Sequence, residues 1–209
     1  MDAIKTIDDL QAKFDRAKQN RNELSGVLCK EFNVRETVKT AWLSFDDINN
    51  ESTFDLEEFR GAYCIGGVDL SITTDLTCAS LLVMKHRSDK KNITQMYWIP
   101  ADRLTERVQQ DKISFDKWCE RDLIRLCTGN ATNYSDVTVW FCEVLQRYEL
   151  FPAGVYYDSY SARYFVEEMQ MQGFNMMRCI QVAKTLSLPM QMLGTDLQAH
   201  KVIYGNNSV

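Results

Sequence analysis

The chain has 209 residues, of which 45% are hydrophobic and 25% are charged, and its formal net charge is −5. This composition is typical of a globular protein and excludes a disordered or fibrous chain. The excess of acidic residues also excludes a globally basic nucleic-acid-binding protein, so any surface that binds nucleic acid has to be local.

The seven cysteines are irregularly spaced and include no C-x-x-C pair. This pattern argues against a disulfide framework and against a zinc knuckle, and two histidines are too few for a histidine-based metal site. No stretch approaches the ~20 apolar residues of a membrane span, and the N-terminus has no signal pattern. We therefore expect reduced thiols and an intracellular setting.

The N-terminal residues 1–60 are predicted to form a helical segment and a linker. Residues 7–20 carry an apolar stripe at helical spacing. From residue 22 the periodicity breaks up, and the segment ends in an acidic, polar stretch. We expect this linker to pack in places without a fold of its own.

The pattern changes after residue 60. Three runs rich in β-forming residues, at 62–70, 76–85 and 93–100, are separated by short turn-forming segments and predict an antiparallel meander. The segments that follow are predicted in this order: a helical turn at 115–121, a strand at 122–127, a helix at 135–148 with a serine cap, a strand at 150–158, a helix at 161–173, a strand at 174–180 and a helix from about 188. This order predicts a mixed α/β sheet flanked by helices. Five aromatic residues at helical or strand spacing are expected in its core: Trp118, Trp140, Phe141, Tyr156 and Tyr157.

Two aspartates end predicted strands. Asp69 lies in "GGVDLSITTDLT" at the end of the first strand, and Asp158 ends "GVYYD" in the same way. If these strands are parallel neighbours, both carboxylates share one rim of the sheet, and like charges so close favour a divalent cation between them. Hard oxygen ligands indicate Mg²⁺ or Mn²⁺, and two such ions ~4 Å apart would suit phosphodiester cleavage.

Each of these residues also has a purely structural interpretation. An aspartate at a strand end is often a turn former, and Asp158 can cap the helix that follows it. Asp75 can fix the hairpin or contribute an oxygen to an outer shell. Gly66 and Gly67 leave room for another backbone or for a phosphate. Spacing alone leaves these alternatives open.

A family resemblance bears on this choice. The motifs "GGVDLSITTDLT", "YWIPADRL", "CTGNATNYSDV", "YYDSYSAR" and "QVAKTLSLPM" resemble, in order and in form, the nuclease half of large terminase subunits of tailed bacteriophages. The resemblance covers about residues 60–205. It implies an RNase H-like nuclease domain at 61–209 that uses clustered acids and two divalent metals, Mg²⁺ or Mn²⁺, to cut concatemeric viral DNA during packaging.

The resemblance also assigns residues and partners. It implies that Asp69 and Asp158 are catalytic metal ligands, whereas the third acid, which belongs on a C-terminal helix, has no counterpart before Val209. Residues 1–60 would be the tail of the preceding ATPase half. Double-stranded DNA, a portal protein and a small terminase subunit would be the partners, in the cytoplasm of the bacterial host and without a membrane.

Several basic residues are candidates for contacts with DNA phosphates. Lys85, Arg87, Lys90 and Lys91 lie between the second and third strands, where they could grip a backbone or simply form a solvated hairpin tip. Arg163 and Lys184 are the other candidates, and both can equally be ordinary surface residues.

Other functions remain open at this stage. The missing third acid suggests a catalytically silent DNA-docking or interaction fragment. The pattern D-x-x-x-T-T from Asp69 to Thr74 suggests an actin-like phosphotransferase, but that fold needs a second glycine-rich phosphate turn, and "YYDSYS" contains no glycine. A phosphate loop for ATP is not present, because Gly67 stands where its lysine would be.

Overall fold

The computed structural model describes residues 11, 15, 42–71, 75–158, 162–207 and 209. The chain divides into two compact units, Met1–Ser44 and Phe45–Val209. The helix predicted at 7–20 lies outside the described residues except for Gln11 and Asp15, which are helical and joined by a hydrogen bond from Gln11 Nε2 to Asp15 Oδ1 (3.1 Å). The fold below is that of the second unit.

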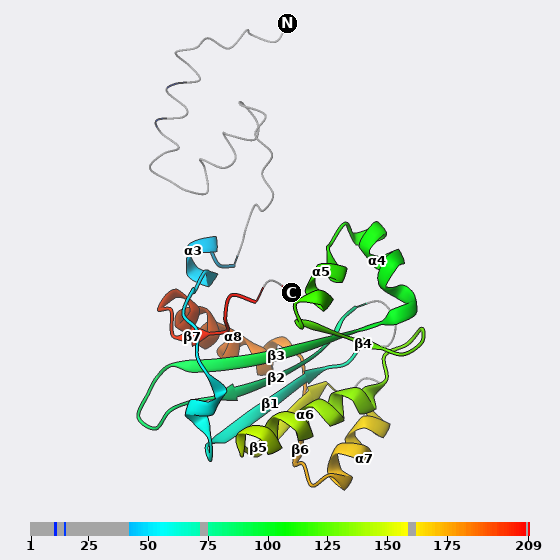
Figure 1. Ribbon diagram of the computed structural model, residues 1–209. Helices are drawn as coiled ribbons and strands as arrows, with labels where there is room; N and C mark the ends of the chain where they lie inside the picture. Colours follow the sequence, from blue (N-terminus) through cyan, green and yellow to red (C-terminus); the bar gives the residue numbers. More distant parts are fainter. Residues whose placement is uncertain (1–10, 12–14, 16–41, 72–74, 159–161, 208) are drawn as a thin grey trace, which may run out of the picture. The chain divides into compact units, whose positions relative to one another are not determined.

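The second unit is built around a seven-stranded sheet (Figure 1). Its strands are β1 (Tyr63–Asp69), β2 (Thr77–Val83), β3 (Lys91–Pro100), β4 (Ile124–Cys127), β5 (Phe151–Asp158), β6 (Met176–Cys179) and β7 (Val202–Ile203). Its helices are α3 (Phe45–Ile48), α4 (Leu104–Asp111), α5 (Phe115–Glu120), α6 (Tyr134–Tyr148), α7 (Arg163–Met171) and α8 (Ala183–Gln198), with 3-10 turns η1 (Leu56–Phe59) and η2 (Ala101–Arg103).

The strand order is β4-β3-β2-β1-β5-β6, with β7 also beside β3. Strands β1, β2 and β3 form an antiparallel meander. The pairs β1–β5, β5–β6, β3–β4 and β3–β7 are parallel. The mixed sheet predicted from the sequence is therefore confirmed.

One irregularity interrupts the pairing of β1 with β5. Ala153 is an extra residue in β5, opposite the junction of Cys64 and Ile65 in β1, and beyond this bulge Val68 pairs with Tyr157. Side chains alternate between the two faces of a strand, so one extra residue changes which side chains of β5 share a face with those of β1.

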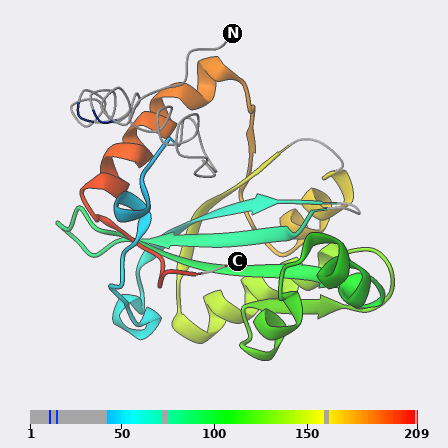
Figure 2. The same cartoon turned by 90° about the horizontal axis from the view of Figure 1, so that it is seen from above.

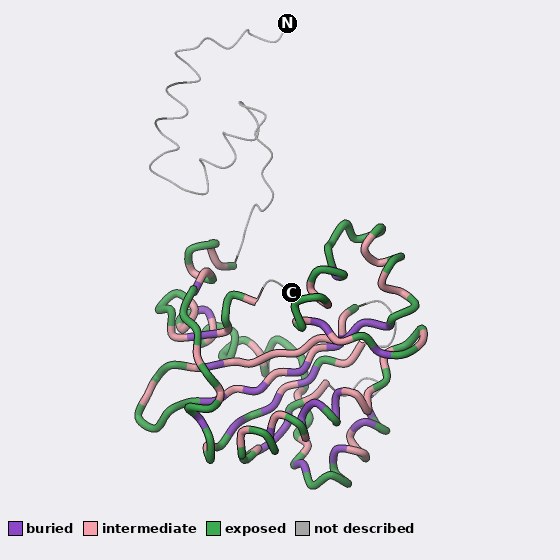
Figure 3. Tube along the Cα trace, in the orientation of Figure 1, coloured by how far each residue is buried: buried purple, intermediate pink, exposed green. Residues whose placement is uncertain are grey.

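Helices α6 and α7 cover one face of the sheet and form the main core with it. Strand β2 alternates between buried and half-buried residues along its length, as expected for a strand with one covered face (Figure 3). Trp140 and Phe141 of α6 are buried as predicted. The predicted serine cap of this helix is wrong, because it is the side chain of Asn133 that accepts a hydrogen bond from the Ser135 N–H (3.2 Å).

Helix α8 lies on the opposite side of the sheet from α6 (Figure 2). On this side Ile65, Tyr156 and Met177 remain 43%, 41% and 38% exposed. The prediction that Tyr156 lies in the core is therefore wrong. A strand pattern shows that side chains alternate, but it does not show which face a helix covers.

Helix α4 and strand β7 were not predicted, and both have weak local patterns: β7 is two residues long, and α4 carries only Leu104 and Val108 as apolar residues. Residues 45–60 belong to the second unit, so the predicted boundary at residue 60 falls inside it. Asn50 Nδ2, for example, donates to the Val202 carbonyl (2.8 Å). Among the residues described, no helix has the length and apolar character needed to cross a bilayer.

Candidate active site

The two aspartates singled out in the sequence lie at the same edge of the sheet. Asp69 is the last residue of β1, and Asp158 is the last residue of β5. These strands are parallel neighbours in which Val68 pairs with Tyr157, so the next position places Asp69 beside Asp158. Neighbouring strands are about 5 Å apart, so the two carboxylates leave the sheet side by side.

The bulge at Ala153 is what brings the two carboxylates to one face. Without the extra residue, the pairing that starts at Cys64 and Pro152 would place Asp69 opposite Tyr157. Asp158 would then point to the other face of the sheet. The acid pair therefore depends on an irregularity of the sheet as well as on the positions of the strand ends.

The acid pair belongs to a row of five side chains that crosses the sheet. Cys78 of β2 is the cross-strand neighbour of Asp69, and Tyr97 of β3 is that of Cys78. On the other side Cys179 of β6 pairs with Asp158. We call these five residues the rim row. Its cysteines and its tyrosine are not predicted as site residues from the sequence, because only the register of the strands aligns them with the aspartates.

Cys78 and Tyr97, which follow Asp69 in the rim row on the β2 side, are neutral at physiological pH. Burial raises the pKa of the Cys78 thiol to about 11; a hydrogen bond with Tyr97 lowers it, and the nearby Asp69 charge adds to the increase. Burial also raises the pKa of the Tyr97 phenol to about 12, and both the charge of Cys78 and the hydrogen bond to it contribute. Neither side chain therefore adds negative charge beside Asp69.

The turn after β1 is fastened to the start of β2. The Ser71 N–H donates to Thr77 Oγ1 (3.1 Å), which in turn donates to the Ser71 carbonyl (3.2 Å). The Asp75 N–H donates to Ser71 Oγ (3.0 Å), and the Asp75 side chain is exposed. These bonds fix the chain immediately beyond Asp69. The outer-shell role of Asp75 stays a prediction.

Gly66 allows β1 to approach the core closely. A Cβ atom there would lie 2.9 Å from Val155 Cγ2 and 3.1 Å from Phe141 Cε1. The space beside Gly66 was predicted to admit another backbone or a phosphate. It is filled by the side chains of Val155 and Phe141. Gly67 points to the other face, where a Cβ would lie 3.1 Å from Ser80 Oγ.

The donor set of the rim suits a hard divalent cation but is small. Two adjacent carboxylates are the kind of oxygen ligands that Mg²⁺ and Mn²⁺ prefer. Across the described ranges, no group of three or more His, Cys, Asp or Glu side chains is arranged to hold a metal ion. Asp69 and Asp158 alone would therefore leave most coordination positions to other oxygen atoms.

The predicted hairpin cations do not lie near the acid pair. Lys85, Arg87, Lys90 and Lys91 belong to the β2–β3 turn or the first residue of β3, next to the start of β1. Asp69 is at the other end of β1, six residues from Tyr63, which corresponds to about 20 Å. Two of these lysines also form ion pairs, Lys85 with Glu58 and Lys91 with Asp196 (2.7 Å).

Arg163 and Lys184 lie nearer to the acid pair along the chain. Arg163 begins α7 five residues after Asp158, and its Nε donates to Glu167 Oε1 (3.0 Å). It lines a cavity of about 390 Å³ together with Tyr157 and Arg178. Lys184 is the second residue of α8, five residues after Cys179, and is exposed. Both follow strands that end at the rim.

Taken together, the sheet order, the flanking helices and the paired carboxylates define the class as an RNase H-like α/β domain. The crystal structure of the HK97 bacteriophage large terminase has the same fold: it matches 99% of this chain and 42% of its own length at 17% sequence identity, with a TM-score of 0.59. The large terminase nuclease of the thermophilic phage G20c matches 70% of this chain and 60% of its own at 13% identity, with a TM-score of 0.44.

Sequence comparison then identifies the family. The family model "Terminase large subunit, endonuclease domain" matches residues 1–209. The chain therefore belongs to the family of terminase large subunit endonuclease domains. It is 30% identical to the large terminase subunit of Enterobacteria phage HK97 over 86 residues, which are 40% of this chain and 16% of that protein. The chain thus spans less than half the length of the HK97 proteins that it matches.

Proposed function

We propose that this domain is the metal-dependent endonuclease module of a phage DNA-packaging motor and that it cuts concatemeric double-stranded DNA. The observation that carries the proposal is the side-by-side position of Asp69 and Asp158 at one rim of the sheet. Membership in the terminase endonuclease family supports the same reaction.

Asp69 and Asp158 would hold the divalent ions, Mg²⁺ or Mn²⁺. When bound, such ions supply positive charge for the scissile phosphate and lower the pKa of a water molecule. The protein contributes two negative charges on adjacent strands whose positions are fixed by the sheet. Cys78 and Tyr97 add no charge at neutral pH, because burial raises both pKa values.

The remaining candidate residues would position DNA. Arg163 and Lys184 follow strands that end at the rim, so they are suited to contact backbone phosphates near the scissile bond. Lys85, Arg87, Lys90 and Lys91 would contact DNA only at the far end of the sheet, about 20 Å away. Asp75 would act through the outer shell of the metal site.

The test measures cleavage and metal binding separately. Supercoiled plasmid is incubated with the 209-residue chain in Mg²⁺ or Mn²⁺, and thermal unfolding is recorded with and without the ion. We expect metal-dependent cleavage by the native protein and none by Asp69→Asn. The metal should raise the melting temperature of the native protein but not that of the variant, because an ion that binds only the folded state stabilises it.

The comparison variant is Asp75→Asn, which removes the proposed outer-shell carboxylate from the same turn. It should reduce cleavage less than Asp69→Asn does and keep most of the metal-induced stabilisation. Cleavage by Asp69→Asn at the native rate, or native cleavage that persists in a chelator, would contradict the proposal. Without metal, Asp69→Asn should be at least as stable as the native chain, because it removes the repulsion between neighbouring like charges.

A second candidate is a catalytically silent DNA-docking or interaction module. It is favoured by the small donor set, since the described residues offer no metal-binding group of three. This candidate predicts DNA binding without cleavage and without a metal-dependent change in melting temperature. An actin-like phosphotransferase has no such support, because the family that matches is a different one.

The biological setting is part of the proposal. A portal protein and a small terminase subunit would be the protein partners, the cytoplasm of the bacterial host would be the location, and residues 1–60 would be the tail of an ATPase half. These assignments rest on the family relationship. Co-purification of the longer large subunit with each partner, compared with the 209-residue chain alone, would test them.

A further inference from the structure

The outer edge of β3 is paired only at its two ends. Lys91 and Asn92 pair with β7, and the stretch from Tyr97 to Pro100 pairs with β4. The residues between Asn92 and Tyr97 face no strand of the described chain on this side. The interval holds four residues, and the distance from Asn92 to Tyr97 is about 17 Å.

The backbone of Gln95 points into this interval. The Lys91 N–H donates to the Lys201 carbonyl, next to β7, so the polar backbone groups of Lys91 face the outer edge. The backbone N–H and C=O groups alternate in direction from one residue of a strand to the next. The groups of Ile93 and Gln95 therefore face the outer edge, as those of Lys91 do, and the groups of Thr94 face β2. Ile93 is adjacent to the β7 pair, whereas Gln95 is adjacent to neither pair.

Two turns keep the neighbouring chains out of the interval. Before β4, Asp122 has a left-handed backbone (φ 56°), and after β7 so do Gly205 (φ 65°) and Asn206 (φ 48°). A residue in this conformation ends an extended strand. The chain therefore leaves strand geometry on both sides of Gln95.

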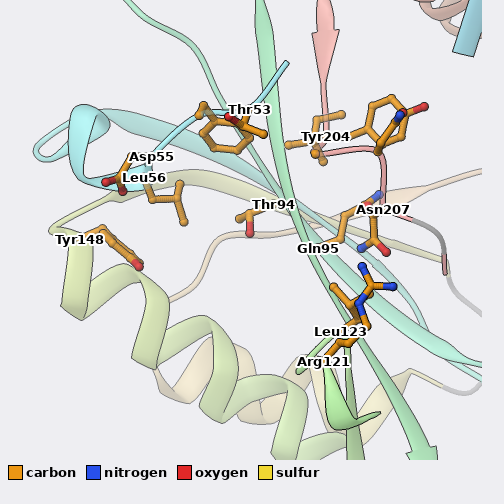
Figure 4. A pocket seen from close by; sticks show the side chains of 14 residues that line it. Thr53, Asp55, Leu56, Thr94, Gln95, Arg121, Leu123, Tyr148, Tyr204 and Asn207 are labelled. Atoms are coloured by element: carbon orange, nitrogen blue, oxygen red, sulfur yellow. The ribbon is translucent and has the colours of Figure 1, made fainter. Parts of the chain in front are cut away.

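A cavity of about 600 Å³ lies over the interval (Figure 4). Gln95, Arg121 and Asn207 gather at one end of it, and Asp55, Leu56 and Tyr148 lie at the other. Its walls come from the segment that includes η1, from the turn before β4 and from the segment after β7. The cavity is separate from the acid pair, since β3 is two strands away from β1 in the sheet.

The two ends of the cavity carry opposite charges. At one end, the Asp55 carboxylate already accepts a hydrogen bond from the Glu57 N–H (3.0 Å). At the other, Arg121 forms no ion pair with any described carboxylate. The charge of Arg121 is therefore available to an acidic side chain beside Gln95.

We propose that this edge of β3 is a docking site for an extended peptide segment of a partner protein. The segment adds a short strand opposite Gln95, with its backbone bonded to the Gln95 N–H and C=O and an acidic side chain directed at Arg121. Addition of a strand to an exposed sheet edge is a common mode of peptide recognition, in which backbone bonds give affinity and side-chain pockets give specificity.

The first experiment uses a capped pentapeptide of alternating valine and glutamate and follows amide hydrogen exchange in the full chain. We expect exchange at the Gln95 N–H to slow about tenfold when the peptide is about tenfold above its Kd, because exchange then requires the free protein. Exchange at Thr94 should not change, because its N–H is already bonded within the sheet. A Gln95 N–H that is as protected as Thr94 without peptide, or one that the peptide does not protect, overturns the proposal.

Matched controls test each part of the contact. A peptide with proline at its central position should not protect Gln95, because it lacks the required donor, and a valine–lysine peptide should bind more weakly beside Arg121. Arg121→Gln should weaken binding of the valine–glutamate peptide. Arg125→Gln, which breaks the ion pair of this β4 residue with Glu143 of α6, should not. Equal binding of the proline peptide, or equal effects of the two arginine variants, rejects the proposed mode.

A proline variant checks the direction of the Gln95 backbone. Gln95→Pro should fold and lose peptide binding, measured by anisotropy of a labelled peptide, because proline is tolerated where the N–H faces outward from an edge strand. Thr94→Pro should lower the melting temperature more, because it removes a bond to β2. If Gln95→Pro binds the peptide as the native chain does, the proposal is wrong; if this variant unfolds, the exchange and arginine experiments decide.

Discussion

The two ends of the central strands use charge in opposite ways. At the carboxyl end of β1, two carboxylates lie side by side in a row in which Cys78 and Tyr97 are neutral. At the other end, Lys85 pairs with Glu58, Lys91 with Asp196 and Lys201 with Asp89. One end concentrates like charge and the other neutralises it. Clustered like charge lowers stability unless a ligand offsets it, so the comparison supports the proposal that the acid end is the site.

The sharpest way to break this comparison is to remove one acid at each end. Asp158→Asn should reduce cleavage by about 100-fold or more, the scale of losing a transition-state stabiliser. Asp89→Asn, which removes the carboxylate that pairs with Lys201, should leave cleavage unchanged. Initial rates of plasmid nicking in Mn²⁺ measure both. Similar losses of cleavage in the two variants would show that cleavage depends on the acid end no more than on the hairpin end.

The next effect concerns the packing that supports the rim. Gly66→Ala should destabilise the fold by about 1–3 kcal/mol, because its methyl group would collide with Val155 and Phe141 in a filled core. Gly154→Ala is the matched control: its Cβ would meet Met177 Sδ at 2.8 Å, and that flexible side chain can move away. Urea unfolding compares the two. Equal destabilisation by the two variants would mean that the close contact of Gly66 with Val155 and Phe141 matters no more than that of Gly154 with Met177.

The pH dependence should be similar at both ends. Burial raises the pKa of Cys64, near the hairpin end, and of Cys78, at the rim, from 9.0 to about 11. Between these values the unfolded thiol has lost its proton and the folded thiol has kept it, so the free energy of unfolding falls as pH rises from 9 to 11. The slope is at most about 1.4 kcal/mol per pH unit for each thiol.

Urea titrations at several pH values measure this slope for the native chain. Cys64→Ala and Cys78→Ala should each make it shallower by a similar amount. A slope that neither variant changes would assign the alkaline loss of stability to other groups. A change in Cys78→Ala alone would instead indicate that the rim dominates the response.

The smallest effect is expected for the hairpin ion pairs. Lys85→Ala and Lys91→Ala should each change the free energy of unfolding by about 0–1 kcal/mol, the usual range for exposed pairs. Lys91 and Asp196 are the less exposed pair, with side chains 30% and 17% exposed, so Lys91→Ala should have the larger effect. Cleavage in low salt should be unaffected. A clear loss of cleavage in either variant would show that DNA contacts at the hairpin are needed for cleavage.

Much of the fold could be predicted from the sequence. The meander, strands β4, β5 and β6 and helices α5, α6, α7 and α8 all have local patterns strong enough to identify them. The exceptions are features whose local pattern is weak or ambiguous. Strand β7 exists because Val202 and Ile203 pair with β3, and the cap of α6 depends on which of several polar residues reaches the free N–H groups.

The candidate site shows the same division. The sequence by itself determined that Asp69 and Asp158 end apolar strands, because alternation and turn residues are local properties of the chain. Only the tertiary structure decided that these strands are neighbours and that the bulge at Ala153 turns both carboxylates to one face. It also aligned Cys78 with Asp69 and separated the hairpin cations from the site. The register between β1 and β5 depends on packing between segments far apart in the chain, and the local pattern of either strand does not show which residue of the other it faces.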